Sequence, residues 1–371
     1  MADRKTICAA MSGGVDSSVV AHLLLREGYA VTGATMKLYR PGMRVSADGV
    51  FLCEPCGAEV ICGSDEDVRD ARLVCDRLGI SHTVYDFGEL FCRRVIGDFV
   101  SEYEAGATPN PCIVCNKHLK FGALLKAALR DGADGIATGH YARVAYDSGS
   151  GRYLLKKALD ESKDQTYVLW QLTQEVLSRV LLPLGDYRKA DIRAMAADLE
   201  LVSAHKSDSQ DICFVPDGDY AAFLARYTGR EAIPGEYISE DGQVLGLHKG
   251  IIHYTVGQRK GLGIALGQPM FVKSKDPVSR QVVLTVNDRL FERKVTVEEV
   301  NLIAAERLDG PVRCEVKIRY NHKGAPAVLI PTGGDTALIC FDEPQRAPAD
   351  GQSAVFYDGD IVIGGGIIRR K

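Results

Sequence analysis

Hydrophobic residues in the first half of the chain alternate between short unbroken runs and runs with helical spacing. Residues 6–10 are an apolar run, and valines and leucines then recur every three or four positions until Gly28 supplies a stop signal. Similar pairs recur further on. The predicted strands are residues 6–10, 30–36, 80–87 and 135–140, and the predicted helices are residues 15–27, 68–78, 120–130 and 189–199. Strands alternating with helices predict right-handed crossovers and a parallel sheet. A further segment with helical spacing is expected to begin at Lys163.

The pattern changes near residue 235, where short alternating strands and glycine turns replace the helices. Regularly spaced strands at residues 313–320, 336–341, 353–357 and 361–368 predict a small β-barrel. We therefore expect an α/β protein of three parts. These are a parallel-sheet domain over residues 1–210, a small mixed central domain over 211–285 and a C-terminal β-barrel over 286–371.

Composition narrows the class of protein. The chain has 371 residues, of which 46% are hydrophobic and 25% charged, values that suit a globular protein of two or three domains. It has no apolar run long enough to span a membrane, and its N-terminus is unlike a signal peptide, so we expect a cytoplasmic protein with no membrane partner. Eleven cysteines in such a protein are expected to serve as thiols or metal ligands rather than as structural disulfides.

Charge is unevenly distributed along the chain. The net charge of −4 does not indicate nucleic-acid binding, but residues 251–330 carry 13 Lys and Arg against 8 Asp and Glu. This region includes a basic, glycine-rich stretch at residues 253–263 and the pair Arg319 and Tyr320, which combines a phosphate-binding side chain with a stacking ring. Charge alone leaves two interpretations open, an RNA-facing surface or a solvated surface of mixed charge.

The first predicted strand leads through a glycine-rich turn directly into a helix. Residues 11–18 read M-S-G-G-V-D-S-S, so backbone N–H groups and the positive end of a helix dipole point at one place. The string lacks the lysine of a Walker A loop and resembles the PP-loop (S-G-G-x-D-S) of the ATP pyrophosphatases. The alternative is a tight turn of small residues. The expected nucleotide contacts are Ala10, Met11, Ser12, Gly13, Gly14, Val15, Asp16 and Ser17, with Met36 and Gly139 as walls for adenine and ribose.

Two cysteines follow a proline-stiffened segment, in the string T-P-N-P-C-I-V-C-N-K at residues 108–117. Cys112 and Cys115 have a spacing that places both on the same side of a turn. A cysteine near Lys117 at a helix start is expected to have a lowered pKa. Cys213 follows a polar stretch, which favours an exposed thiol. Cys8, Cys75, Cys92 and Cys340, in contrast, fit buried inert cysteines.

A less regular insert lies between Arg40 and Ser64 and contains Cys53, Cys56 and Cys62. A C-x-x-C pair with a third cysteine is compatible with a metal site. No fourth ligand is evident within the insert, so a thiol-bearing loop is the preferred interpretation.

Taken together, the motifs match one family. S-G-G-V-D-S-S, T-P-N-P-x-x-x-C-N-K, T-G-H-Y, K-D-Q, D-S-Q-x-I-C-F and Y-T-x-G-Q-R-K-G-L-G occur in that order. The chain thus resembles the bacterial tRNA-specific 2-thiouridylases (the MnmA/TrmU family) over nearly its full length, the insert excepted. The PP-loop alone indicates only the superfamily, whereas the two cysteine motifs are specific to this enzyme.

The resemblance implies a reaction in two steps. ATP with Mg²⁺ would adenylate the C2 oxygen of the wobble uridine of tRNA, and sulfur would then replace that oxygen. A persulfide would form on Cys213, and Cys115 would attack it, leaving a Cys115–Cys213 disulfide. The sulfur donor would be a cysteine desulfurase or a sulfur relay protein. The implied tRNA contacts are Asn110, Pro111, Cys112, His140, Lys163, Asp164, Gln165, Arg319, Tyr320 and Gln352.

One residue departs from the family pattern. Many members have aspartate where Cys112 stands, and here Cys112, Cys115 and Cys213 supply three thiolates. Related tRNA thiolases use such a trio to hold a [4Fe–4S] cluster. A persulfide relay and a cluster mechanism therefore both remain open. The rival functions are another PP-loop ligase acting on RNA, such as a tRNA lysidine synthetase, an amidotransferase-type synthetase, and a nucleotide-dependent tRNA-binding module without chemistry.

Overall fold

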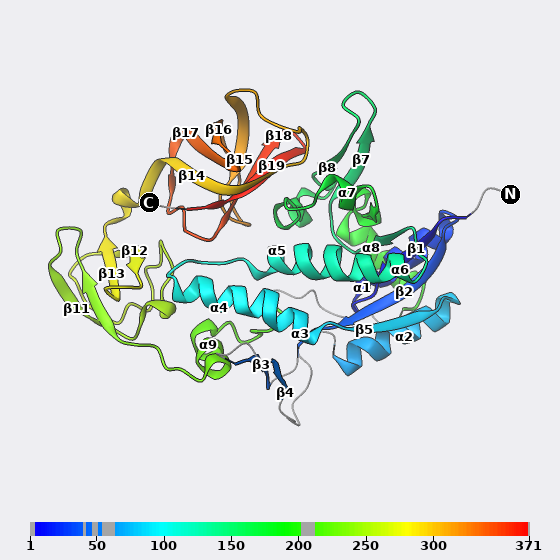
Figure 1. Cartoon of the computed structure of the whole chain (residues 1–371), viewed down its shortest axis with the longest axis horizontal. Coiled ribbons are helices and arrows are strands. Elements are labelled where there is room, and N and C mark those ends of the chain that lie inside the picture. Colours follow the sequence, from blue (N-terminus) through cyan, green and yellow to red (C-terminus); the bar gives the residue numbers. More distant parts are fainter. Residues whose placement is uncertain (1–3, 40–41, 47–50, 54–63, 202–211, 370–371) are drawn as a thin grey trace. The chain divides into compact units, whose positions relative to one another are not determined.

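A computed structural model of the chain describes residues 4–39, 42–46, 51–53, 64–201 and 212–369 (Figure 1). The chain divides into two compact units. Unit 1 comprises residues 1–95, 112–216 and 360–362, and unit 2 comprises residues 96–111, 217–359 and 363–371.

Unit 1 is built on a parallel sheet of five strands in the order β5-β2-β1-β6-β9. The strands of the sheet are β1 (Thr6–Ala10), β2 (Ala30–Lys37), β5 (His82–Asp86), β6 (Gly135–Ala137) and β9 (Val180–Leu181). Its helices are α1 (Val15–Arg26), α2 (Asp65–Leu78), α3 (Gly88–Phe91), η1 (Cys92–Ile96), α5 (Pro111–Cys115), η2 (Asn116–Leu124), α6 (Leu125–Arg130), η3 (Glu161–Lys163), η4 (Thr166–Val168), α7 (Gln174–Leu177), η5 (Pro183–Asp186) and α8 (Lys189–Asp198). Two hairpins, β3 (Met43–Val45) with β4 (Phe51–Cys53) and β7 (Arg143–Asp147) with β8 (Arg152–Lys156), complete it.

The strand order reverses between β1 and β6. The chain proceeds outward through β2 and β5 on one side of β1, and through β6 and β9 on the other. Parallel sheets bind ligands at such a switch point, beyond the carboxyl ends of the strands. The loops at this point are residues 11–14, which follow β1, and residues 138–140, which follow β6.

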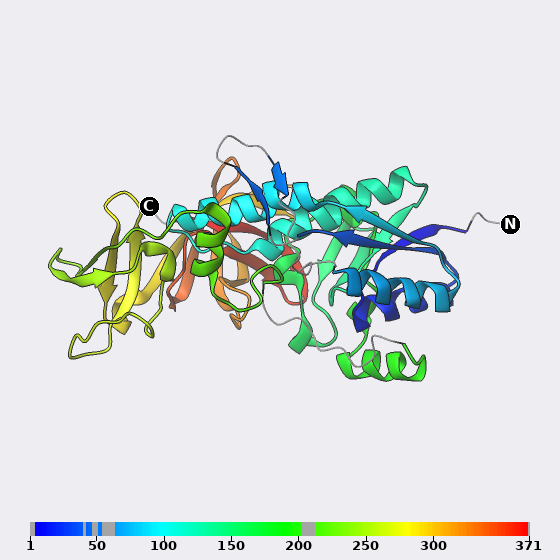
Figure 2. The same cartoon turned by 90° about the horizontal axis from the view of Figure 1, so that it is seen from below.

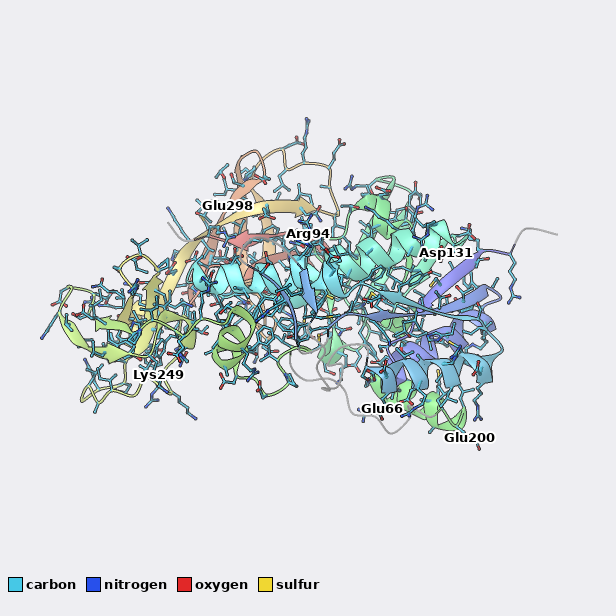
Figure 3. All side chains as sticks on the ribbon, turned by 60° about the horizontal axis from the view of Figure 1, so that its bottom comes forward. Glu66, Arg94, Asp131, Glu200, Lys249 and Glu298 are labelled. Carbon is cyan, nitrogen blue, oxygen red and sulfur yellow. The ribbon has the colours of Figure 1, made fainter. Side chains whose placement is uncertain are left out.

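Helices cover both faces of this sheet. Apolar side chains of α1, α2 and α8 share one core cluster with β1 and β2, including Val20, Leu24, Val74 and Ile192. In Figure 2 these three helices lie on one side of the strands, and the continuous helix formed by α5, η2 and α6 lies on the other. Arg77 at the end of α2 forms an ion pair with Glu200, a residue that follows α8. Glu200 is labelled in Figure 3.

Unit 2 contains a mixed four-stranded sheet and a closed barrel. The sheet has the order β11-β10-β13-β12, and the barrel has the order β14-β17-β16-β15-β18-β19 with β14 pairing back to β19. The elements are α4 (Gly97–Glu104), α9 (Tyr220–Thr228), β10 (Gly235–Ile238), β11 (Val244–His248), η7 (Ile251–His253), β12 (Phe271–Asp276), β13 (Gln281–Thr285), η8 (Asn287–Leu290), β14 (Phe291–Leu302), β15 (Val312–Lys317), β16 (Ala325–Gly333), β17 (Thr336–Arg346), β18 (Ser353–Asp358) and β19 (Ile361–Ile368).

The predicted fold class is confirmed: a parallel-sheet domain, a mixed central sheet and a C-terminal barrel. Three local predictions are wrong. The helix predicted at residues 120–130 begins at Pro111 and passes through a π-helical segment. Short 3-10 turns replace the helix expected from Lys163. Tyr320 lies beyond the end of β15 rather than on a strand. In the described part of the chain, no helix is long and apolar enough to cross a membrane.

Candidate active site

The loop after β1 has the geometry of an anion-binding turn. Gly13 has a φ of +73°, which disfavours any residue with a side chain. A Cβ at Gly13 would also lie 2.7 Å from the backbone oxygen of Asp67, in the first turn of α2. Gly14 is the N-cap of α1 and makes no side-chain capping bond. The N-terminus of α1, the positive end of its dipole, therefore lies at this turn without a side-chain cap from Gly14.

Serine hydroxyls fix the shape of this loop. Ser17 Oγ accepts a 3.1 Å hydrogen bond from the Ser12 backbone N–H and donates to the Gly14 carbonyl at 3.1 Å. Ser18 Oγ also donates to the Gly14 carbonyl, at 2.9 Å. The side chain of Ser12 is exposed, whereas Ser17 and Ser18 are buried. Ser12 Oγ also lies 3.1 Å from Ser17 Oγ, so all three hydroxyls take part in the loop, and that of Ser12 is the one on an exposed side chain.

Asp16 is held by two residues that the sequence did not single out. Lys189 Nζ lies 2.8 Å from both carboxylate oxygens of Asp16, and the Tyr141 hydroxyl donates to Oδ1 at 2.9 Å. Lys189 is only 8% exposed and is the first residue of α8. The sequence contained one indication that Lys189 has a special role. It begins a predicted helix, where the positive end of the helix dipole disfavours a cation.

The loop after β6 closes against the same turn. A Cβ at Gly139 would lie 3.0 Å from Asp16 Cβ and 3.3 Å from the Ser17 backbone nitrogen, so glycine allows the two loops to approach. His140 is buried, and its Nδ1 lies 2.7 Å from Thr138 Oγ1. Burial, assisted by the charge of Lys120, holds the pKa of His140 well below its usual range. His140 is therefore a neutral ring at physiological pH.

Met36 is half-buried at the end of β2, next to the carboxyl end of β1 in the sheet. Its neighbour Thr35 donates to the Met11 carbonyl at 2.8 Å, and the Met11 N–H donates to the Ala34 carbonyl at 2.7 Å. These bonds tie the first residue of the loop to the end of β2. The structure thus brings Met36 and Gly139 to the same sheet edge as residues 10–17, as the sequence predicted.

Cys112, Cys115 and Cys213 come together within unit 1. Cys112 is exposed in the first turn of α5, and Cys115 is buried at its end. The charges that act on the Cys115 thiol include those of Cys213 and Cys112, which places the three thiols within electrostatic range of one another. Phe214 is buried, and its ring meets Phe91 edge-to-face at 5.6 Å. Phe214 therefore anchors the segment that presents Cys213, which is itself exposed.

The expected low pKa of Cys115 is wrong. The pKa of this thiol is raised to about 12, mainly by burial, with Lys120 lowering it and Cys213 and Cys112 raising it. The reason is position: Cys115 lies where α5 continues into η2, below the protein surface, rather than at an exposed helix start. The cation that acts on it is Lys120 instead of Lys117.

The three thiols, in the described part of the chain, do not form a site for a single metal ion. Among the residues that the structure describes, no group of three or more His, Cys, Asp or Glu side chains is placed to hold a metal ion. The three thiols are nevertheless donors of the type that an iron–sulfur cluster requires. Cys56 and Cys62 of the insert, with the Cys53 side chain, lie outside the described residues.

Two residues of the K-D-Q segment serve local structure. Asp164 accepts hydrogen bonds from the Ala158 N–H at 3.1 Å and the Thr166 hydroxyl at 2.6 Å. Gln165 Oε1 accepts from the Tyr141 N–H at 2.9 Å. Lys163 is half-buried at the end of η3. The segment thus positions Tyr141, which in turn contacts Asp16.

The remaining predicted RNA contacts lie in unit 2. Gln352 Nε2 donates to the Thr108 carbonyl at 2.8 Å, two residues before Asn110 and three before Pro111. Arg319 donates to the Arg346 carbonyl at 3.1 Å, and Tyr320 is 41% exposed. Gln352 therefore has a role in holding the segment that leads to Cys112, which the sequence did not indicate.

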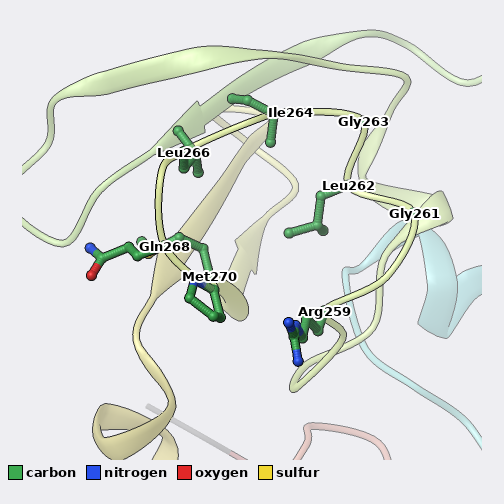
Figure 4. Close-up of a pocket in the computed structure, with 9 residues that line it drawn as sticks. Arg259, Gly261, Leu262, Gly263, Ile264, Leu266, Gln268 and Met270 are labelled. Atoms are coloured by element: carbon green, nitrogen blue, oxygen red, sulfur yellow. The ribbon is translucent and has the colours of Figure 1, made fainter.

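A separate hollow of about 320 Å³ lies in the central sheet domain. Figure 4 shows Leu262, Ile264, Leu266 and Met270 around it, with Arg259 at one side. Arg259 and Leu262 belong to the second half of the basic, glycine-rich stretch, and the other apolar side chains of the hollow follow that stretch. Tyr254 in the first half is buried and packs against Tyr237, so part of the motif serves the core of unit 2.

Comparison with known proteins agrees with this architecture. Three family models match in succession: the tRNA methyl transferase HUP domain over residues 5–217, the tRNA methyl transferase PRC-barrel domain over 221–285 and the aminomethyltransferase beta-barrel domain over 292–368. The HUP match bears out the expected nucleotide-using domain at the level of domain type.

Curated relatives match over the whole chain. The chain is 47% identical to the tRNA-specific 2-thiouridylase MnmA of Clostridioides difficile, covering 99% of each chain. It is 48% identical to the enzyme of the same name from Acetivibrio thermocellus, again covering 99% of each. A solved structure of the U34-tRNA thiolase NcsA from Methanococcus maripaludis shares 18% identity, with a TM-score of 0.34 over 60% of this chain and 66% of that one, and is too remote to bear on the chemistry. The chain therefore belongs to the MnmA family of tRNA-specific 2-thiouridylases.

Proposed function

We propose that the turn at residues 11–17 binds ATP and that the enzyme adenylates the C2 oxygen of the wobble uridine of tRNA. The single observation that carries this proposal is the uncapped N-terminus of α1 at the switch point of the sheet. Backbone N–H groups at such a terminus bind phosphate oxygens. Attack of the uridine oxygen on the α-phosphorus expels pyrophosphate and leaves AMP on the base as a leaving group.

The oxygen atoms beside the turn suit a magnesium ion carried by the nucleotide. Mg²⁺ prefers carboxylate and hydroxyl oxygens, and Asp16 and Ser12 offer both at the start of α1. The ion would neutralise charge on the leaving pyrophosphate. Asp16 is the residue that would hold it, and Gly139 keeps the facing loop close enough to enclose the phosphates.

Sulfur transfer falls to Cys213 and Cys115. The exposed Cys213 accepts a sulfur atom from a cysteine desulfurase or a relay protein and becomes a persulfide. The Cys115 thiolate then attacks the inner sulfur of that persulfide, so that a Cys115–Cys213 disulfide forms and hydrosulfide leaves. Hydrosulfide attacks C2 of the adenylated uridine and expels AMP. The sulfane sulfur is reduced to sulfide, the two thiols are oxidised, and a thiol reductant must reset the enzyme.

Cys115 must lose its proton before it can attack. Burial favours the neutral thiol, and Lys120 is the cation that opposes this effect. A buried thiol is protected from adventitious oxidation while the site is idle. Its activation on substrate binding would couple sulfur release to the presence of tRNA. The target base must leave the anticodon stack to reach these residues.

The decisive experiment separates the persulfide route from the cluster route. Enzyme purified without oxygen is analysed for iron and for visible absorbance, and then assayed with ATP, tRNA and a desulfurase by mass spectrometry of the nucleosides. The proposal expects 2-thiouridine from iron-free enzyme, and loss of product in Cys213→Ser and Cys115→Ser. Stoichiometric iron that is lost in Cys112→Ser, together with activity that depends on it, would replace the persulfide route by a cluster held by Cys112, Cys115 and Cys213.

A further inference from the structure

Lys189 contributes a buried positive charge directly beside the nucleotide turn. Its Nζ lies 2.8 Å from Oδ1 and 2.8 Å from Oδ2 of Asp16, and its side chain is 10% exposed against 29% for Asp16. Asp16 lies in the first turn of α1, two residues after the N-cap Gly14. The pair is therefore part of the wall of the site, although 173 positions separate its members in the sequence.

The turn itself contains no cation. Residues 11–18 include one carboxylate and no lysine or arginine. A carboxylate beside a polyphosphate repels it at short range unless a counter-charge is present. Lys189 is the residue whose ammonium group cancels that charge.

The backbone of Lys189 is held in place, whereas its side chain is long and flexible. The Lys189 N–H donates to Asp160 Oδ2 at 3.1 Å, and the residue begins α8, which packs on α1. Its ammonium lies 5.6 Å from the centre of the Tyr141 ring, whose hydroxyl also binds Asp16. A four-carbon arm on a fixed backbone lets the ammonium turn from Asp16 to a phosphate oxygen without movement of the helix.

We propose that Lys189 is the resident counter-ion of the nucleotide site. It pairs with Asp16 while the site is empty. When the nucleotide binds, its ammonium donates to a phosphate oxygen and leaves the Asp16 carboxylate to the magnesium ion that the nucleotide carries. This inference rests on the proposed binding of ATP at residues 11–17 and assigns its missing cation.

The test measures metal and nucleotide binding separately. Mn²⁺ serves as a probe for Mg²⁺ and is titrated by electron paramagnetic resonance without nucleotide, and ATP is titrated by calorimetry in EDTA. In Lys189→Met the freed carboxylate should bind Mn²⁺ at least about tenfold more tightly and ATP at least about tenfold more weakly. Lys189→Arg should retain most of the ATP affinity. Lys126→Met, at an exposed position of α6, should behave as wild type.

Opposite changes in the two affinities distinguish a counter-ion from a structural residue. The double variant Asp16→Asn with Lys189→Met leaves no unpaired charge, and should fold while losing the gain in Mn²⁺ affinity. Unchanged affinities in Lys189→Met, or a parallel loss of both with a lower melting temperature, would overturn the counter-ion role. Wild-type enzyme that binds no ATP, in EDTA or with Mg²⁺ present, would instead overturn the proposed nucleotide site.

Discussion

Cys115 is a buried thiol in an enzyme for which we propose a thiolate nucleophile. Its pKa is raised from an ordinary 9.0 to about 12, mainly by burial. The protonated form therefore dominates at neutral pH, and the thiolate fraction rises about tenfold for each pH unit below the pKa. A low thiolate fraction is acceptable for a thiol that has to react only after its substrate is bound.

We expect the alkylation rate of Cys115 to rise about tenfold per unit between pH 7 and pH 9, without a plateau. The measurement uses iodoacetamide on enzyme in which Cys112 and Cys213 are serine, with mass spectrometry of the peptide that contains residue 115. Lys120→Met should slow alkylation at every pH, because Lys120 is the charge that lowers this pKa. A plateau below pH 9 would mean that the thiol ionises far more easily than its burial allows.

Gly139 tests how tightly the two loops enclose the nucleotide. A methyl group there would lie 3.0 Å from Asp16 Cβ, so Gly139→Ala must push the first turn of α1 aside. Overpacking of this kind costs typically about 1–3 kcal/mol, and we expect ATP affinity measured by calorimetry to fall by about five- to a hundredfold. Gly132→Ala, which has open space around it but a φ of +92°, is the control for general glycine strain. Equal ATP affinity in Gly139→Ala and wild type would show that the loops do not enclose the phosphates.

Residues whose role follows from a continuous motif were predictable from the sequence. Residues whose role depends on packing between distant segments were not. Gly13, Gly14 and Asp16 form one continuous motif whose turn geometry follows from residue type. Lys189 reaches Asp16 only because α8 packs on α1, a contact that spacing along the chain does not encode. The error on Cys115 has the same origin, because burial of its helix outweighs the nearby lysine.

At the scale of elements, the segment that carries Cys112 is clamped from its N-terminal side. Lys275 Nζ donates to the Tyr254 carbonyl at 2.8 Å and to the Ala107 carbonyl at 3.4 Å, and Gln352 donates to the Thr108 carbonyl. The Thr108 N–H donates to the Asp350 carbonyl at 2.7 Å. β12 of the central sheet and the loop before β18 of the barrel thus both hold residues 107–108, within unit 2.

We predict that Gln352→Ala increases backbone exchange over residues 105–111. A single hydrogen bond contributes about 0.5–1.5 kcal/mol, so exchange measured by deuterium uptake should accelerate by roughly two- to tenfold there. Lys275→Met should have a similar effect at residue 107 and beyond. Gln268→Ala, at an exposed position outside this clamp, provides the comparison. Unaltered exchange in Gln352→Ala would mean that Gln352 does not hold this segment, which would leave contact with RNA as its role.

The bounds of elements with a strong hydrophobic periodicity were predicted to within a few residues. The bounds of irregular elements were not. α2 and α8 have both a stripe of apolar residues and an uninterrupted length, so their bounds follow from the sequence. The helix that contains Cys115 begins at Pro111, nine residues earlier than its periodicity indicates, since π-helical turns at residues 116–124 break the 3.6-residue repeat. The β7–β8 hairpin was missed because its alternation is short.

At the scale of the whole molecule, the two proposed chemical steps use different parts of unit 1. The nucleotide turn follows β1, whereas Cys115 and Cys213 lie on a helix and a segment after α8. This separation was predictable, because the PP-loop motif and the cysteine motifs are distinct in the sequence. Substitution of the cysteines should therefore give a variant that performs adenylation but not sulfur transfer.

Cys115→Ser and Cys213→Ser should still adenylate tRNA while failing to thiolate it. Pyrophosphate release on addition of ATP and tRNA should stay within about threefold of wild type for one turnover, since both thiols lie outside the phosphate turn, and 2-thiouridine should fall below detection by mass spectrometry. Asp16→Asn should lose both activities by at least about a hundredfold, because loss of a carboxylate that orients a metal-bound nucleotide costs several kcal/mol of transition-state stabilisation. If the cysteine variants released no pyrophosphate, activation and sulfur transfer would have to be a single concerted event, and the cysteines would belong to the same reaction centre as the PP-loop.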